Sequence, residues 1–466
     1  MKKLYSALVI LLLTAIISNS FAGGHKIKFK ITGLAGKTVY VGNHYGDKQY
    51  ITDTIVVDAQ NYFTLQGEKE LEGGIYFVLN KDKQILFEFF IVEQQFSLET
   101  DTLDYTAHMK VKGSLENEIY NNFNKFFSAS RKKSVALEAR LKKNQNNADS
   151  TKIIKELIEK AGKELQTYME DVIKKYPDCL LTKIFLINKP IDIPDAPDPK
   201  DTTFALRYHQ KHYFDYTDFS DPRLLRTPVL HTKIYNYLDR LVYPIPDSLK
   251  IAAEMICEKS RANKEVFRYV VSNLTYYYES SKYMGMDAVF VHLADKYYLK
   301  GEAWWADTAI VNKIQDRVNK IKPTLIGEKA YNVNFVDTTL AKIYSLYGVK
   351  ADYTLVFLFD PGCGHCKTVT AELMENYDTL KSLGAEVYAI CTQPEIDKWK
   401  KFIRERKLKW INVGPTSNEY RDYYDVYLTP IIYLLDKEKR IVAKKIDVTQ
   451  VKEIIRREKK KKADKG

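Results

Sequence analysis

The stretch LVFLFDPGCGHC, residues 355–366, decides the fold of the C-terminal part of this chain. Its apolar half predicts a buried strand, and the residues after it open an amphipathic helix. Cys363 and Cys366 therefore lie three residues apart at a strand-to-helix turn, where a disulfide can form and break with little backbone movement. The helix N-terminus stabilises a thiolate on Cys363, and an imidazolium at His365 would favour that thiolate further. The pattern indicates thiol–disulfide exchange.

Two other interpretations of the C-x-x-C pattern stay open, a zinc site and an inert structural disulfide. A structural zinc site needs two more Cys or His ligands at suitable spacing, and the chain has no second C-x-x-C. The other cysteines, Cys179, Cys257 and Cys391, are scattered singly and are expected to be buried, with a Cys179–Cys257 bridge as an alternative. We predict no metal and no cofactor other than a redox-active Cys363–Cys366 disulfide.

The start of the chain has the pattern of a secretory signal peptide. Two lysines follow Met1, the next fourteen residues are mostly apolar, and Ser20-Phe21-Ala22 forms a small-x-small cleavage pattern. A retained membrane anchor is the alternative, but the apolar run is short for a span. We therefore predict a cleaved signal peptide at residues 1–22, no stable membrane span, and a soluble protein of the periplasm or cell envelope.

The net charge of +12 gives little information about partners. Part of it lies in RREKKKK, residues 456–462, and we assign residues 458–466 to a basic tail that forms a solvated helix end. Weak attraction to anionic lipid is an alternative. Because the sequence has no nucleic-acid-binding motif and the chain is predicted to be exported, we expect no nucleic-acid partner.

Three regions follow the signal peptide. Residues 23–112 contain short strands separated by glycine turns, as in KIKFKI at 26–31, and predict a small antiparallel β-sandwich or barrel without a catalytic constellation. His25, His44 and His108 are isolated there and are expected at the surface. Residues 113–320 have helical periodicity, interrupted by a proline-rich loop at 190–200, and predict an all-α domain.

Residues 323–457 alternate between strands and helices. Apolar strands are predicted at 355–359, 385–390, 430–436 and 441–443. Helices are predicted after Cys366, at 398–406 and from about Thr449. Such an order predicts an α/β layer with a mixed sheet.

This last region resembles the thioredoxin superfamily. The resemblance rests on DPGCGHCK, residues 360–367, followed by Thr429-Pro430 at the head of a strand. It implies a thioredoxin-like fold in which Pro430 is cis and faces the active disulfide. Pro430 would then position the substrate, and the backbone beside it would align the substrate by edge pairing, with Thr429 and Pro361 as further substrate-binding residues.

Within the superfamily, the chain is similar to the TlpA/ResA-like envelope thiol–disulfide oxidoreductases. The strand and helix inserted after Ala385 carry this resemblance. The β region resembles the N-terminal domain of uncharacterised function in Bacteroidetes members, and the middle resembles their helical domain of unknown function.

Two departures from the family pattern affect the mechanism. Phe359 stands where many relatives have Trp. Phe357 stands where thioredoxin and the disulfide isomerases carry a buried acid that accepts the proton of the second cysteine. The proton acceptor for Cys366 is therefore open between Asp360 and solvent.

The resemblance and exchange chemistry together imply a mechanism. Cys363 attacks a substrate disulfide, Cys366 resolves the mixed disulfide, and His365 tunes the thiolate. The expected partners are disulfide-bearing envelope proteins and a membrane thiol protein that donates electrons. The Gly-His dipeptide is that of disulfide isomerases, at about −180 mV, whereas thioredoxin lies at about −270 mV. We expect a reductase. The alternatives are an isomerase or oxidase, or a binding or scaffold protein with a minor redox site.

Overall fold

The computed structural model describes residues 23–332, 334–393 and 395–464, so the predicted signal peptide lies outside the described residues. The chain forms two compact units. The first contains the chain up to Leu241 together with 259–266, and the second contains 242–258 and the chain from Phe267 onward. Each unit is described by itself, and the predicted domain boundaries stay predictions. None of the described helices is long and apolar enough to cross a membrane.

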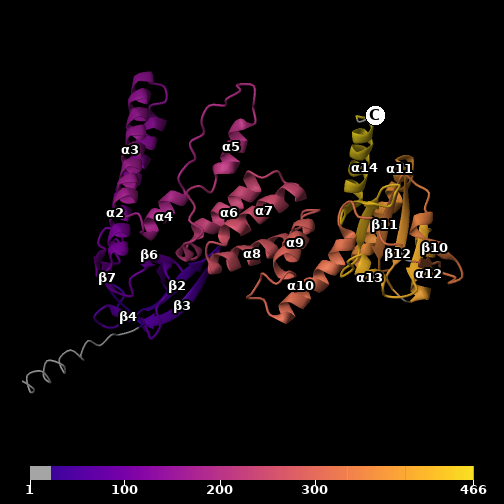
Figure 1. Ribbon diagram of the computed structural model, residues 1–466, viewed down its shortest axis with the longest axis horizontal. Helices are drawn as coiled ribbons and strands as arrows, with labels where there is room; N and C mark the ends of the chain where they lie inside the picture. The colour runs from indigo at the N-terminus through magenta and orange to yellow at the C-terminus, as the bar shows by residue number, and fades with distance from the viewer. Residues whose placement is uncertain (1–22, 333, 394, 465–466) are drawn as a thin grey trace, which may run out of the picture. The chain divides into compact units, whose positions relative to one another are not determined.

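The first unit begins with two four-stranded β-sheets, which confirm the predicted β-sandwich (Figure 1). Apolar side chains from both sheets, Phe29 and Val41 among them, form one core. The sheets have the orders β4-β1-β7-β8 and β3-β2-β5-β6. The strands are β1 (His25–Thr32), β2 (Thr38–Tyr45), β3 (Lys48–Val56), β4 (Tyr62–Gly67), β5 (Gly74–Leu79), β6 (Ile85–Ile91), β7 (Gln95–Asp101) and β8 (Lys110–Lys112).

Two expectations for this region were wrong. The sandwich is not wholly antiparallel, because β1 pairs with β7 in parallel. These strands lie far apart in the sequence, so no hairpin connects them and the parallel direction is allowed. His44 is not a surface residue: it is 7% exposed, and its Nε2 lies 3.3 Å from a carboxylate oxygen of Glu88.

The predicted helical character of the middle region is confirmed. The first helix starts at Ser114, whose side chain accepts a hydrogen bond from the backbone N–H of Asn117. The first unit holds α2 (Leu115–Lys143), α3 (Ala148–Lys175), α4 (Leu180–Ile187), α5 (Phe204–His212), η1 (Pro222–Arg226) and α6 (Pro228–Arg240). Helices α7 (Pro246–Ser260) and α8 (Lys264–Glu279) contribute residues to both units, and the second unit continues with α9 (Asp287–Leu293), η2 (Ala294–Tyr298), α10 (Thr308–Ile321) and η3 (Lys322–Thr324).

The second unit also contains a seven-stranded mixed sheet, with the order β10-β9-β13-β12-β11-β14-β15. The central strand β11 (Tyr353–Phe359) runs parallel to β12 (Ala385–Cys391) and antiparallel to β14 (Ile431–Leu435). The other strands are β9 (Asn334–Val336), β10 (Ile343–Ser345), β13 (Ile411–Pro415) and β15 (Ile441–Lys444). The elements between them are η4 (Leu346–Gly348), α11 (Gly364–Ser382), α12 (Ile396–Arg406), α13 (Tyr420–Tyr423) and α14 (Val448–Ala463), so most of the predicted basic tail is the end of α14.

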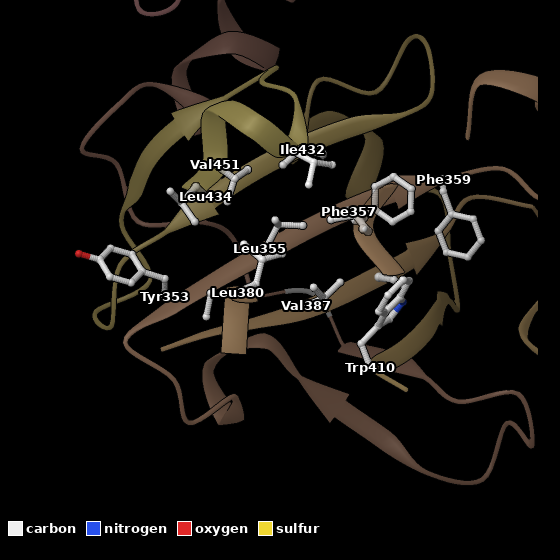
Figure 2. Close-up of a cluster of buried hydrophobic side chains, with 14 of the residues drawn as sticks. Tyr353, Leu355, Phe357, Phe359, Leu380, Val387, Trp410, Ile432, Leu434 and Val451 are labelled. Atoms are coloured by element: carbon white, nitrogen blue, oxygen red, sulfur yellow. The ribbon is translucent and has the colours of Figure 1, made fainter. Parts of the chain in front are cut away.

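Strand β11 is buried along its whole length, and its side chains alternate between two cores. Tyr353, Leu355, Phe357 and Phe359 enter the core formed with α11, α12 and α14 (Figure 2). Val356 and Leu358 enter the core on the other face. This burial on both faces explains the continuous apolar run in the sequence, and it fixes the end of β11, where the two cysteines follow.

Candidate active site

The turn after β11 places the first cysteine at the start of a helix. A side-chain oxygen of Asp360 accepts a hydrogen bond from the N–H of Gly362 at 2.6 Å, and the Asp360 carbonyl accepts one from the N–H of Cys363 at 3.1 Å. These bonds close the turn, and Cys363 becomes the N-cap residue of α11. The thiol therefore lies beside N–H groups of the first helical turn that have no backbone partner within the helix.

The two thiols have opposite environments. The N–H of Cys366 donates a hydrogen bond to Sγ of Cys363 at 3.4 Å, and this bond lowers the pKa of the Cys363 thiol. Cys366 is 0% exposed, and burial raises the pKa of its thiol to about 11. Both cysteines are free thiols, and Cys363 is partly exposed. An accessible thiol that ionises easily, next to a buried one that does not, has the asymmetry that dithiol exchange requires.

A second segment reaches the cysteines from far along the chain. The Thr429–Pro430 peptide bond is cis, as the resemblance predicted. The carbonyl oxygen of Thr429 lies 3.6 Å from Sγ of Cys363, which donates to it. Since β14 follows directly and pairs with β11, the sheet itself brings this segment to the N-terminus of α11.

The other predicted site residues lie close to this pair. His365 is exposed on the first turn of α11, and its backbone N–H also lowers the pKa of Cys363. Pro361 is buried in the turn. The roles of His365 in thiolate tuning and of Pro361 in substrate binding stay predictions.

Core packing fills the position at which thioredoxin and the disulfide isomerases carry a buried acid. Phe357 and Phe359 are 1% and 0% exposed, and their rings stack with centroids 5.3 Å apart. Asp360 carries the acidic group near the cysteines, and its N–H donates to Sγ of Cys366 at 3.4 Å. Its second carboxylate oxygen accepts a hydrogen bond from Nε2 of Gln393 at 2.7 Å. Sequence reasoning missed Gln393, although it follows β12 as Asp360 follows β11, so both residues lie at the same edge of the sheet.

A groove of about 560 Å³, called here the active-site groove, is lined by His365, the residue before Cys366, and by Pro430. His365 and Val369 of α11 line one side, and Tyr427, Leu428 and Pro430 line another. Tyr427 and Leu428 are exposed by 60% and 81%. Sequence analysis did not identify these residues, because a groove depends on which surfaces the fold brings together. Apolar and charged side chains line the groove together, and such a surface can accept a polypeptide chain.

The chain matches three families, one over each region. Residues 326–444 match the AhpC/TSA family. Residues 25–120 match a domain of unknown function, DUF4369, and residues 191–330 match another, DUF5106. Residues 326–444 thus form a thioredoxin-like domain of the AhpC/TSA family, which is a domain of oxidoreductases.

Several solved structures are similar to this chain. A thioredoxin-like protein from Bacteroides caccae shares 22% identity over 57% of this chain and 98% of its own, with a TM-score of 0.46. A domain of a possible thiol-disulfide isomerase from Cytophaga hutchinsonii shares 36% identity over 30% of this chain and 97% of its own, with a TM-score of 0.29. The thioredoxin domain of a Bacteroides vulgatus thiol-disulfide oxidoreductase shares 28% identity over 28% and 96%, with a TM-score of 0.27. Among curated proteins, the comparison found no match.

Proposed function

We propose that this protein is a thiol–disulfide oxidoreductase of the cell envelope that reduces protein disulfides through Cys363-Gly364-His365-Cys366. The observation that carries the proposal is the contrast between the two thiols. The pKa of Cys363 is lowered by the N–H of Cys366, whereas burial raises the pKa of Cys366. Cys363 therefore attacks first, and Cys366 acts in the second step.

The proposed reaction balances as two exchanges. The Cys363 thiolate attacks one sulfur of a substrate disulfide, forms a mixed disulfide and releases the other substrate sulfur as a thiolate. Cys366 then loses its proton and attacks Sγ of Cys363, which forms the Cys363–Cys366 disulfide and releases the second substrate thiolate. Two electrons pass to the substrate, and an electron-donating thiol protein of the membrane must restore the dithiol.

Insulin reduction tests this chemistry. With dithiothreitol as electron donor, the full chain should accelerate the reduction of insulin disulfides. A Cys363→Ser, Cys366→Ser double variant is the matched control and should not accelerate it. A wild-type rate equal to that of the double variant would refute the enzymatic proposal. Full cellular function of the double variant would favour a binding or scaffold role instead.

The direction of electron flow is tested by the reduction potential of the Cys363–Cys366 pair. We expect a value nearer that of thioredoxin, about −270 mV, than that of the isomerases, about −180 mV. The Gly-His dipeptide favours the second candidate function, an isomerase or oxidase. A potential near the isomerase value, with acceleration of scrambled ribonuclease refolding, would establish that candidate and overturn the reductase.

The envelope location is proposed from the predicted signal peptide. Fractionation of cells that express the full chain should recover it outside the cytoplasm, shortened after Ala22. Recovery of a full-length cytoplasmic protein would contradict the location without affecting the chemistry.

A further inference from the structure

A buried carboxylate lies in the loop that leads to the cis-proline. The Asp425 side chain is 2% exposed, and both of its oxygens have cationic partners. Nη1 of Arg317 lies 2.6 Å from Oδ1, and Nζ of Lys445 lies 3.2 Å from Oδ2. Lys445 directly follows β15 of the mixed sheet, whereas Arg317 is on α10, in the segment that matches DUF5106.

Helix α10 also contacts Tyr427, two residues after Asp425. The guanidinium carbon of Arg317 lies 5.2 Å from the ring centroid of Tyr427, and Nζ of Lys320 lies 5.4 Å from it. These are cation–π distances. Helix α10 thus holds the loop at Asp425 and at Tyr427.

A second ion pair also joins the segment that matches DUF5106 to the mixed sheet. Lys444 of β15 is 3% exposed and pairs with Asp287 of α9, and its Nζ donates to the hydroxyl of Thr324 at 3.1 Å. The ammonium group of Lys444, at the end of β15, is therefore held by residues that precede the sheet in the sequence.

The loop that contains Asp425 and is held by α10 forms one wall of the active-site groove. Asp425, Tyr427 and Leu428 line the groove and lead directly into Thr429 and Pro430. His365 and Val369 of α11, the helix capped by Cys363, line the groove as well. The shape of the groove that reaches His365 therefore depends on where the loop is held.

We propose that Arg317 is a positioning residue that sets the groove wall for polypeptide substrates, so that the helical segment is part of the substrate site. The proposal rests on the proposed function. A buried carboxylate that loses one of two cations keeps its desolvation cost. Without Arg317, Asp425 would retain the Lys445 side chain, which is 51% exposed, and the loop would move toward solvent. A small disulfide reaches Cys363 without touching this wall, whereas a protein chain lies along it.

The kinetic test compares two substrates in the full chain. Arg317→Ala should lower kcat/KM for insulin reduction by about tenfold, mainly through KM. Its rate with dipyridyl disulfide and the ultraviolet absorbance of the Cys363 thiolate should change by less than about twofold, because the N-cap of α11 is untouched. Arg317→Lys should restore part of the loss. Lys313→Ala, an exposed lysine one turn earlier on α10, is the matched control and should leave both reactions unchanged.

Hydrogen exchange gives a readout that does not depend on activity. The loop keeps other bonds in the variant, since the Tyr433 hydroxyl donates to the Tyr424 carbonyl at 2.6 Å, so it should loosen without unfolding the domain. Amides 425–428 should exchange faster in Arg317→Ala than in Lys313→Ala. The positioning role would be overturned by unchanged exchange of these amides in Arg317→Ala, or by an equal loss of rate with insulin and with dipyridyl disulfide. Faster exchange in a protein whose wild type does not reduce insulin would instead refute the proposed function alone. If Arg317→Ala does not fold, Arg317→Gln, which removes the charge and keeps part of the side chain, takes its place, and wild-type exchange and KM in that variant would refute the positioning role.

Discussion

Strands β11 and β12 are parallel neighbours whose last residues, Phe359 and Cys391, are paired. A thiol lies at the end of each strand, and the two thiols have opposite properties. After β11, the chain turns at Asp360 and places Cys363 at the N-terminus of a helix, partly exposed and with a lowered pKa. At the end of β12, Cys391 is 0% exposed, and burial raises its pKa to about 12.

The difference shows that position at a sheet edge does not make a cysteine reactive. Each thiol donates to a backbone carbonyl, Cys391 to Gln393 at 3.7 Å and Cys363 to Thr429 at 3.6 Å, so these bonds do not separate the two cysteines. Burial is the largest cause of the raised pKa of Cys391. Sγ of Cys363 accepts from a backbone N–H, which favours its thiolate. Reactivity therefore follows access to water and the backbone N–H groups at the helix start that reach Cys363.

The largest expected contrast is in alkylation of the two thiols in the folded protein. With a pKa of about 12, Cys391 is ionised in about one molecule in 100,000 at neutral pH. Iodoacetamide should therefore label Cys363 several orders of magnitude faster, and the Cys363 rate should level off at a lower pH than that of an ordinary thiol. Peptide mass spectrometry measures both rates. Comparable labelling of Cys391 before unfolding in urea would contradict the difference in reactivity between the two thiols.

Removing each thiol should have unequal effects on insulin reduction. Cys363→Ser should lower the rate by about a thousandfold or more, because no other described thiol combines exposure with a lowered pKa. Cys391→Ala is the matched control, and its rate should stay within about twofold of wild type. A large loss of activity in the Cys391 variant, in a protein with wild-type circular dichroism, would give that thiol a role in the reaction.

Cys366→Ser should separate attack from resolution. Turnover should fall by about a hundredfold, while the first exchange at Cys363 continues and a mixed disulfide accumulates. Non-reducing electrophoresis of envelope extracts should show adducts that disappear in the double serine variant. If no adducts form, the proposal that Cys363 attacks the substrate is wrong.

The smallest expected effect concerns Asp360, whose negative charge raises the pKa of both Cys363 and Cys391. Asp360→Asn removes that charge and keeps an acceptor for the N–H of Gly362, so the Cys363 thiolate should form at lower pH. Below its pKa, the alkylation rate should rise a few-fold. Asp352→Asn, before the other end of β11, should leave the rate unchanged. A slower rate in Asp360→Asn would mean that the carboxylate favours the thiolate.

Much of the thioredoxin-like domain could be predicted from the sequence, and the reasons for the misses are physical. Strands β11, β12, β14 and β15 have apolar runs, because they are buried in the sheet. Strands β9, β10 and β13 were missed, because they are short and their mixed polarity gives no clear period. The pairing of Gly414 with Val336 depends on the folded sheet and has no local signal.

The sequence by itself determined the chemistry of the candidate site. A buried strand, a turn and a helix place Cys363 at a helix N-terminus with Cys366 one turn further on, and all of these features are local. Only the tertiary structure decided which groups surround them. It brings Thr429 to Cys363, buries Cys391 and pairs Arg317 with Asp425, 108 residues away. Burial and long-range ion pairs depend on which surfaces pack together, and no local pattern contains that information.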